Sequence, residues 1–545
     1  IMSIFSKISA PKLKFSNFNL SEEMKCSMGI GDLVPILCKE VLPSDSFKVS
    51  TELLIKFAPL KAPVMHRIKA YVHYFFVPTF QVDGVFENFI NPKVNSDNSI
   101  VPPFIAPSFI YTYGKNASNT FLNTLSDYLG FPVHNSGWLQ QTSEQGGFIS
   151  VDPFRCYQHI YNCYYRDQNS EPDGDTGIFN IEAYKGYSGN LFGYLTSAQR
   201  YALVKLRKRA WAKDYFTSAL PSPQAGDDVL LPMSSIIESN GHFKLQGSST
   251  QDFSDGAVEI TTEAIDDDSG VGTLSGQDDV GDYTPLEYFS GLKVKNSQTS
   301  INDLRRALAL QRFKELAERG GTRYSEMVRN FFGSFLKDYW IDRPIYLGGQ
   351  IQDIKVGEVF QTSQTTTGGS ASALATRGGT AQSYGRTKGV YLKSPCHGYL
   401  MGILSVRPEA TYQQGVERMW TRKSIFDFAF PQFARMGEQE IYNREIYAQG
   451  SSDDEQIFGY APRYAEYKSG HCHVCSEFRS SLSYWHFGRK FNSLPTLSKE
   501  FVMMDNVSTD PFNVVDASEP KLYVDLYNNI YARRPLPYFG NPSVL

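Results

Sequence analysis

The chain has 545 residues, a formal net charge of -4, 41% hydrophobic residues and 20% charged residues. This composition excludes a wholly disordered chain, and the near-neutral charge excludes a general electrostatic attraction to nucleic acid. The length exceeds the size at which one hydrophobic core usually stops growing, so we expect several domains or one domain with long insertions.

Aromatic residues make up 14% of the chain, a content that favours β-strands and large protein interfaces. The seven cysteines are scattered at positions 26, 38, 156, 163, 396, 472 and 475. An odd, scattered set indicates no disulfide framework and favours a reducing compartment such as a cytoplasm. No apolar run approaches the roughly 18 residues of a membrane span, and the first residues lack the apolar stretch of a secretory signal. We therefore expect synthesis in a cytoplasm and no membrane insertion.

The first clear pattern is an alternation over 47–57, which predicts a strand with one buried face. A second strand is predicted over 65–77, where the polar face becomes apolar towards the end. Residues 398–406 are apolar at both parities, which predicts a strand covered on both faces. Further strands are predicted at 472–485 and 521–527.

One helix is predicted over 302–319, because five apolar residues fall on one arc of its helical wheel. These residues are Ala309, Leu310, Phe313, Leu316 and Ala317. Two stretches differ in composition from the rest. Residues 225–285 are acidic and polar, residues 361–389 are rich in Gly, Thr and Ser, and both indicate exposed loops or insertions.

The only cluster that resembles a metal site is His471-Cys472-His473-Val474-Cys475. A zinc site normally needs four ligands, and in a strand these side chains would divide between two faces. We therefore favour a structural strand over a metal site. The sequence has no phosphate-binding glycine loop, nucleophile elbow or zinc-protease motif, and nothing in it requires catalysis or a cofactor.

The densest basic run comprises Lys205, Arg207, Lys208, Arg209 and Lys213. Because Trp211 and Tyr215 lie within or beside it, the run could bind single-stranded nucleic acid through phosphate pairing and stacking. A solvated charged face or an ion-pair site between subunits explains the same residues.

Several segments together resemble the major capsid protein of gokushoviruses, a branch of the Microviridae. The matching stretches are GDLVPILCKEVLPSDSFKVSTELLIKFAPL (31–60), APVMHRIKAYVHYFFVP (62–78), KDYFTSALPSPQ (213–224), LRRALALQRFKELAERGGTRYSEMVRNFFG (304–333), RPIYLGG (343–349), HGYLMGILSVRP (397–408) and TYQQGVERMW (411–420). They occur in the family's order and spread across most of the chain. Phe313 stands where the family pattern has Trp, and residues 225–285 match no family motif.

The resemblance implies a mainly β fold, an eight-stranded antiparallel jelly roll with long insertions between strands and a few helices. It also implies a T=1 icosahedral shell around a circular single-stranded DNA genome, built in the bacterial cytoplasm. The implied partners are further copies of the chain, the genome, a small basic DNA-binding protein, an internal scaffolding protein, a pilot protein and a host receptor.

The resemblance divides the chain into an N-terminal part of the core (1–224), a surface insertion (225–285) and the remainder of the core (286–545). The insertion would protrude near the threefold axes and attach to the host. Its candidate residues are Asp227, Asp228, Asp266, Asp267, Asp268, Asp278 and Asp279. In this setting the basic run is a candidate for contact with DNA or the basic protein on the inner surface.

One alternative is a jelly-roll carbohydrate-binding or carbohydrate-active protein, whose strands would give similar patterns. That alternative predicts a concave site with paired carboxylates, or a stable monomer or small oligomer. It does not explain the ordered family segments.

Overall fold

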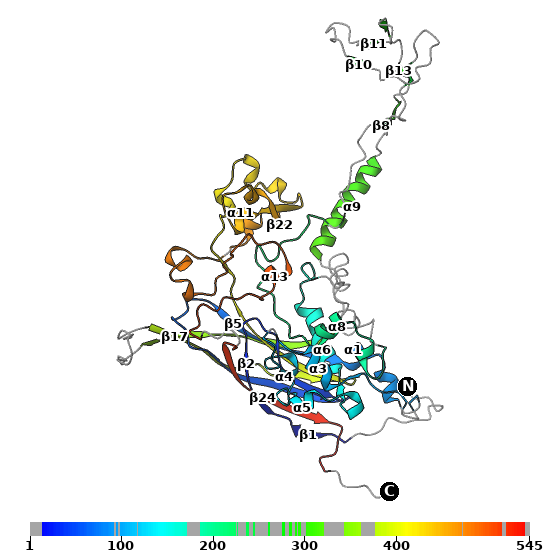
Figure 1. The fold of residues 1–545 in the computed structure, drawn as a ribbon, viewed down its shortest axis with the longest axis vertical. Coiled ribbons are helices and arrows are strands. Elements are labelled where there is room, and N and C mark those ends of the chain that lie inside the picture. Colours follow the sequence, from blue (N-terminus) through cyan, green and yellow to red (C-terminus); the bar gives the residue numbers. More distant parts are fainter. Residues whose placement is uncertain are drawn as a thin grey trace. The chain divides into compact units, whose positions relative to one another are not determined.

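The computed structural model gives the fold of the chain (Figure 1). It describes residues 14–91, 94–95, 99–116, 118–171, 186–224, 226, 343–360, 377–470, 472–514 and 519–539. Between 227 and 342 it describes seven short strands and one helix, and the side chains of 304–316.

The larger of two main sheets has seven strands and is antiparallel throughout. Its central strand β4 pairs with β24 on one side and with β17 and β18 on the other. The strands are β1 (Ser16–Asn19), β2 (Glu22–Met28), β4 (Ser46–Phe57), β16 (Lys355–Phe360), β17 (Arg377–Arg386), β18 (Val390–Lys393) and β24 (Leu522–Arg534). The predicted strands at 47–57 and 521–527 are confirmed, the second as part of the longer β24.

The second sheet has four antiparallel strands in the order β15-β5-β19-β3. They are β3 (Val34–Val41), β5 (Ile68–Pro78), β15 (Ile345–Asp353) and β19 (Gly398–Pro408). β5 and β15 are direct neighbours although residues 79–344 separate them in sequence, with Phe76 opposite Ile345. A very long excursion of the chain therefore leaves and re-enters the sheet at one place.

The main hydrophobic core lies between the two sheets. It combines Phe47 and Ile55 of β4 and Leu526 of β24 with Tyr74 of β5 and Leu404 of β19. A mainly β architecture with antiparallel sheets and few helices, as expected from the sequence, is confirmed.

A second core covers the other face of the four-stranded sheet. Phe75 and Val77 of β5 and Met401 and Ile403 of β19 pack there against helical side chains such as Phe154. The helices that contribute to this core are α1 (Thr79–Val82), α3 (Pro107–Tyr113), α4 (Leu125–Tyr128), α5 (Ser136–Leu139), α6 (Asp152–Ile160) and α8 (Ser197–Val204). The short strands β6 (Phe104–Ile105) and β7 (Ile149–Ser150) form a pair among them, and α2 (Phe86–Ile90) has no buried residue. The prediction that the strand at 398–406 is covered on both faces is confirmed. The polar positions of 65–77 become apolar towards the end of the strand, where the helices cover β5.

The interpretation of 361–389 as a loop is wrong for its second half. Residues 361–376 lie outside the described part, but Arg377–Arg386 form β17 within the larger sheet. The buried face of β17 carries the small residues Gly379, Ala381 and Ser383. A Cβ atom at Gly379 would lie 2.4 Å from the carbonyl oxygen of Ala62. The strand needs small residues where another backbone approaches closely, and such residues give no hydrophobic alternation.

A third core forms a lobe, drawn in yellow and orange in Figure 1, that joins residues 210–220 to 410–504. Its elements are β20 (Thr411–Tyr412), β21 (Glu438–Tyr442), α11 (Asn443–Ile446), β22 (Ile457–Pro462), α12 (Ala465–Lys468), β23 (Cys472–His473) and α13 (Lys499–Val502). The predicted strand at 472–485 is wrong beyond β23. Ser476–Arg479 and Ser483–Trp485 are 3₁₀ turns, and their aromatic residues pack as a local cluster rather than across a sheet.

Residues 224–316 form a compact unit separate from the rest of the chain. The unit holds β8 (Ile236–Glu238), β9 (Lys244–Leu245), β10 (Ile260–Thr261), β11 (Ser275–Gln277), β12 (Tyr283–Pro285), β13 (Phe289–Ser290), β14 (Lys293–Lys295) and most of α9 (Ile301–Gly320). The predicted helix at 302–319 is confirmed as α9. Leu310, Phe313 and Leu316 on its apolar arc are exposed. In the described part of the chain, no helix combines the length and the hydrophobicity that a membrane span requires.

Candidate functional site

The basic run follows α8, and its most buried member is Arg207, which is 5% exposed. Its guanidinium donates to the side chain of Gln158 across 2.7 Å, and Nη1 lies 3.7 Å from a carboxylate oxygen of Glu171. The guanidinium also lies over the ring of Tyr161. These contacts join α6 to the residues that follow it, so Arg207 stabilises the helical layer as a buried residue.

Glu171 gathers several partners of this buried group. Tyr161 donates to it across 2.6 Å, and Lys499 of α13 lies 2.5 Å away. Burial raises the pKa of the Glu171 carboxyl, but the hydrogen bonds from Lys499 and Tyr161 outweigh burial and bring the pKa below its usual value. Glu171 is therefore a charged centre that ties the helical layer to the lobe.

The remaining lysines of the run lie nearer to solvent. Lys208 is 3.7 Å from Asp32, and Lys213 pairs with Asp167. The Lys205 side chain is exposed at the surface, while partial desolvation of its amine by neighbouring residues, followed by the charges of Arg207 and Lys499, lowers its pKa. The two aromatic residues proposed for stacking, Trp211 and Tyr215, are buried in the lobe core. Contact of this run with DNA stays a prediction, and Lys205 is the member best placed for it.

Arg209 lines a cavity of about 370 Å³ against the polar part of β5. Its guanidinium lies 4.0 Å from the centre of the Tyr71 ring, beside Arg407, and donates to Ser405 across 2.8 Å. Burial, followed by Arg209 and Arg407, lowers the pKa of His73 to about 4. Burial and Arg407 also lower the pKa of Arg209 to about 10, so Arg209 stays charged at neutral pH. The cavity is cationic and aromatic.

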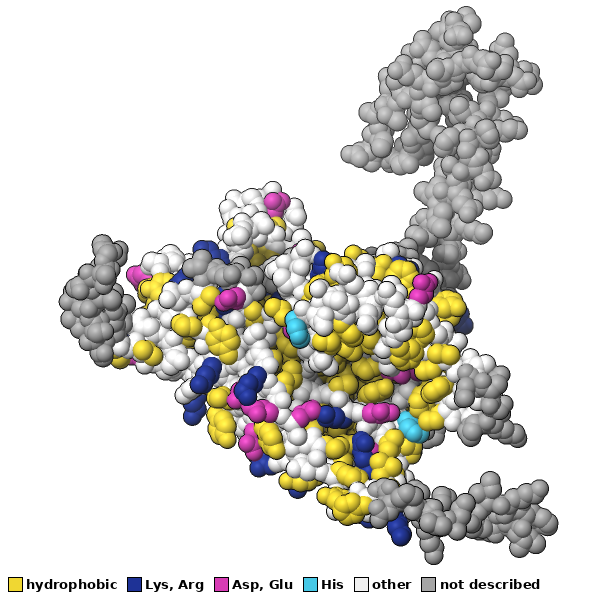
Figure 2. All heavy atoms as spheres, turned by 60° about the horizontal axis from the view of Figure 1, so that its bottom comes forward, with side chains coloured by type: hydrophobic (Ala, Val, Ile, Leu, Met, Phe, Trp, Pro, Cys, Tyr) yellow, Lys and Arg dark blue, Asp and Glu magenta, His cyan; other side chains and the backbone are white. Residues whose placement is uncertain are grey.

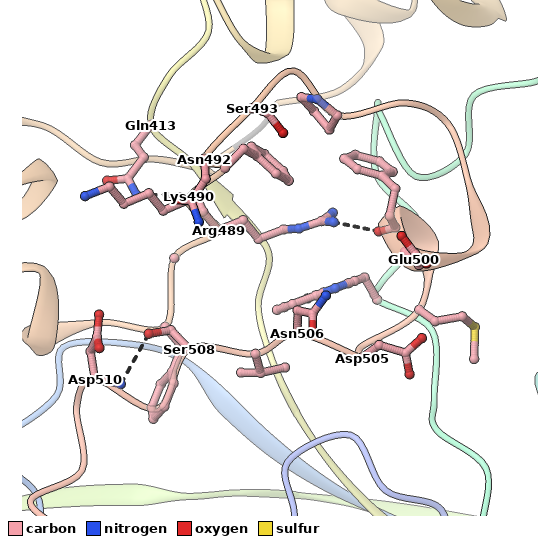
Figure 3. Close-up of a pocket in the computed structure, with 18 of the residues that line it drawn as sticks. Gln413, Arg489, Lys490, Asn492, Ser493, Glu500, Asp505, Asn506, Ser508 and Asp510 are labelled. Atoms are coloured by element: carbon pink, nitrogen blue, oxygen red, sulfur yellow. Dashed lines mark hydrogen bonds between the residues drawn. The ribbon is translucent and has the colours of Figure 1, made fainter. Parts of the chain in front are cut away.

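A further cavity of about 820 Å³ is an open polar groove lined by Trp211, Gln413 and most of the residues between 486 and 510 (Figure 3). Figure 3 shows Arg489 extending across it towards the backbone of Phe501, whose carbonyl it meets at 2.6 Å. The Arg489 guanidinium also stacks on Trp211 and Phe501. Its donors and its faces are engaged by the protein, so Arg489 braces the groove.

The histidine and cysteine cluster divides in the structure. Cys472 and Cys475 are exposed free thiols, and His473 lies 3.9 Å from a carboxylate oxygen of Glu417, while His471 is outside the described residues. β23 is only two residues long and runs parallel to β20. Within the described ranges, no three His, Cys, Asp or Glu side chains are grouped so that they could hold a metal ion.

The acidic residues predicted to attach to the host lie outside the described residues. They are Asp227, Asp228, Asp266, Asp267, Asp268, Asp278 and Asp279.

Sequence reasoning missed an exposed aromatic segment on the lobe, residues 416–436. Trp420 is 74% exposed, and Met419, Ile425, Phe426 and Phe428 are at least half exposed. Arginines support it: Arg418 lies 3.5 Å from Glu445, and Arg422 lies over Tyr467. Large apolar side chains rimmed by arginine are the usual composition of protein-protein contact surfaces. The sequence did hold a sign of this surface: aromatic residues are dense between 419 and 433 and follow neither a strand nor a helix period.

Among the described residues, the buried Arg207 stabilises the fold, and the partly buried Arg489 braces the open groove. The large apolar surface points outward. These features define a structural β-sandwich protein built to contact other chains.

The family model described as capsid protein (F protein) matches residues 6–544. The chain belongs to this family of capsid proteins, which confirms the resemblance found in the sequence. It is a structural protein of the virion and not an enzyme, and it works as one of many copies in a shell. The carbohydrate-binding alternative receives no support from these matches.

Three curated relatives are called capsid protein VP1. The protein of Bdellovibrio phage phiMH2K is 32% identical over 560 residues, which cover 99% of this chain and 97% of the relative. The proteins of Chlamydia phage 1 and Spiroplasma virus 4 are 30% and 28% identical, with the same coverage of both chains. The similarity therefore extends across the sandwich, the helical layer and the lobe.

Proposed function

We propose that the chain is the major shell protein of a T=1 icosahedral capsid that encloses a circular single-stranded DNA genome. The observation that carries the proposal is membership of a capsid protein family over 6–544, a match that includes every part of this fold. Assembly takes place in the cytoplasm of the host bacterium. The free state of all seven cysteines agrees with a reducing compartment.

We infer that the two sheets form an eight-stranded jelly roll. The support is the path of the chain, which visits the larger sheet with β2, β4, β17 and β24 and the smaller sheet with β3, β5, β15 and β19. In the larger sheet β24 lies between β2 and β4, and in the smaller sheet β19 lies between β3 and β5. Late strands inserted between early ones are the mark of two interleaved Greek keys.

The aromatic segment 416–436 is proposed as a contact with a neighbouring copy in the shell. Leaving Trp420, Ile425 and Phe426 in water costs free energy that a neighbouring copy removes by covering them. The segment also carries four basic and two acidic residues in a chain whose net charge is -4, so a second copy offers it a surface of the opposite average charge.

Residues 225–285 are proposed as the part that protrudes near the threefold axes and engages the host receptor. The support is that these residues fall within the separate unit 224–316, and that their acidic, polar sequence suits an exposed surface. The proposed further partners are an internal scaffolding protein, a pilot protein and a small basic DNA-binding protein.

The experiment is electron microscopy and sedimentation of the chain expressed together with the neighbouring phage genes. Uniform icosahedral shells with projections at the threefold axes are the expected result. Monomers or small oligomers alone, with the scaffolding protein present, would contradict the proposal. Deletion of 225–285 serves as the matched variant, and it should give smooth shells that no longer adsorb to host cells.

A further inference from the structure

The outer face of the larger sheet carries a regular pattern of tyrosines and basic residues. Along β24 the outward positions include Tyr523, Tyr527 and Tyr531, which are 44%, 41% and 54% exposed. Tyr391 of β18 and Tyr384 of β17 share this face and are 63% and 76% exposed. The opposite positions of β24, such as Leu526 and Ile530, are in the core between the sheets.

The strand register places lysines between these rings. Lys48 of β4 is opposite Tyr531 on one side and Tyr391 on the other, and Lys56 is opposite Tyr523. Directly opposite residues in antiparallel strands have Cβ atoms about 5 Å apart. Tyrosine and lysine thus alternate across three neighbouring strands. Figure 2 brings the lower edge of Figure 1, where β24 and β1 are seen, towards the viewer, and Lys, Arg, Asp and Glu side chains lie there among hydrophobic ones.

The face is positively charged although the chain is not. The outward positions of β2, β24, β4, β17 and β18 carry six cations and three carboxylates. The carboxylates are engaged locally: Glu23 pairs with Lys25, Asp525 lies 4.0 Å from Lys25, and Glu52 lies 3.6 Å from Arg386. Among the described residues, the exposed side-chain amines of Lys48, Lys56 and Lys393 have no hydrogen bond or ion pair within the chain, so their charges face solvent.

We propose that this tyrosine-lysine face binds single-stranded DNA, with bases stacked on the tyrosines and phosphates paired with the lysines between them. Aromatic side chains interleaved with cations on an open sheet surface suit single strands, because every base has a face that can stack. The net positive charge disfavours a basic protein as the occupant. The proposal deepens the proposed function and rests on it for the identity of the DNA, since the shell is proposed to enclose such a genome.

The face also explains how a chain of net charge -4 can contact DNA. Attraction is concentrated on one surface, whereas the earlier candidate Arg207 is buried and Lys208 and Lys213 are paired with carboxylates. The inner surface of the shell is then the outer face of the larger sheet, and the four-stranded sheet with its helical cover is directed away from the genome.

The first test is titration of the purified full-length chain with a fluorescent thymidine oligonucleotide. K48E/K56E should weaken binding at least tenfold. Replacing both lysines with neutral residues should make the slope of the logarithm of the binding constant against the logarithm of the salt concentration shallower by about 1.4, because each phosphate that a lysine no longer neutralises accounts for about 0.7. Tyr531→Ala should weaken binding about tenfold, whereas Tyr531→Phe, which keeps the ring, should retain it. The matched control K115E/K468E changes the charge equally at exposed positions outside the larger sheet and should bind as the parent does.

Equal affinities of K48E/K56E and the control would overturn the inference, as would loss of binding in Lys205→Glu alone. The second test is ultraviolet crosslinking of assembled particles followed by peptide mapping. Crosslinks should fall on Tyr523, Tyr527 or Tyr531, and crosslinks confined to other segments would contradict the assignment. If no particles form, the proposed function fails while the titration still decides the inference. Normal particles with unchanged DNA content in K48E/K56E would refute the inference alone.

Discussion

The hydroxyl of Tyr74 in β5 donates to the hydroxyl of Thr51 in β4 across 2.6 Å and so joins the two sheets through the middle of the core. Thr51 in turn donates to Asn528 of β24 across 2.7 Å, and Asn528 donates to the carbonyl oxygen of Ile36 in β3 across 2.7 Å. Thr387 lies 3.0 Å from the same tyrosine oxygen. All four side chains are buried, so this chain of hydrogen bonds fixes the register of one sheet against the other.

Removing the hydroxyl with Tyr74→Phe should lower the free energy of unfolding by about 1 to 2 kcal/mol, because Thr51 and Thr387 lose a buried partner. Chemical denaturation of the unassembled chain measures the change. Tyr384→Phe, at a 76% exposed site, is the control and should have no measurable effect. Equal stability of the two variants would show that the network does not contribute.

Arg207→Ala should destabilise the fold by about 3 kcal/mol, since it leaves Gln158 and Glu171 without a buried cation. Lys205→Ala, at an exposed position of the same run, should change stability by less than about 0.5 kcal/mol. Thermal unfolding of both variants gives the comparison. Full stability of Arg207→Ala together with reduced DNA content in particles would instead support direct contact of Arg207 with the genome.

His73 should make the fold sensitive to mild acid. Its folded pKa of about 4 lies below the usual value, so the unfolded chain takes up a proton before the folded chain does. Stability present above about pH 6.5 is lost as the pH falls towards 4, by roughly 3 kcal/mol at most. His73→Gln should flatten the curve of stability against pH in this window. An unchanged slope in the variant would assign the acid sensitivity to other groups.

Trp420→Ala combined with Phe426→Ala should prevent or weaken shell assembly while leaving the isolated chain folded. Each ring is a candidate anchor worth about 2 kcal/mol at a subunit contact, but neither is buried within the chain. Sedimentation measures assembly, and circular dichroism measures folding. Met65→Ala, at a position 68% exposed outside the lobe, is the control. Normal shells from the double variant would remove 416–436 from the contacts between copies.

Strands with a regular alternation could be predicted, because a strand with one buried and one exposed face has apolar and polar residues in turn. β4, β5, β19 and α9 belong to the elements whose own pattern was sufficient. β17 was missed because its buried face is made of Gly, Ala and Ser, which carry little hydrophobic signal. Most of the short helices of 79–204 were missed because packing in the second core, rather than a helical period in their own sequence, stabilises them.

The candidate site was harder to predict for a different reason. A run of cations is visible in sequence, but whether each cation meets solvent or a buried carboxylate depends on residues far away, as Glu171 does for Arg207. The tyrosine-lysine face, in contrast, is not visible as a run in the sequence. Its members are scattered from 23 to 533 and become neighbours only when β24 inserts between β2 and β4.

Residues 79–344 leave the four-stranded sheet after Pro78 and return at Ile345 beside the strand that they left. The entropic cost of closing such a loop rises only with the logarithm of its length, so the sandwich is nearly indifferent to how much chain is looped out there. We therefore expect that the unit 224–316 within this excursion can be replaced without unfolding the sandwich. We expect a foreign domain that replaces this unit to be displayed on every subunit while the sandwich stays folded.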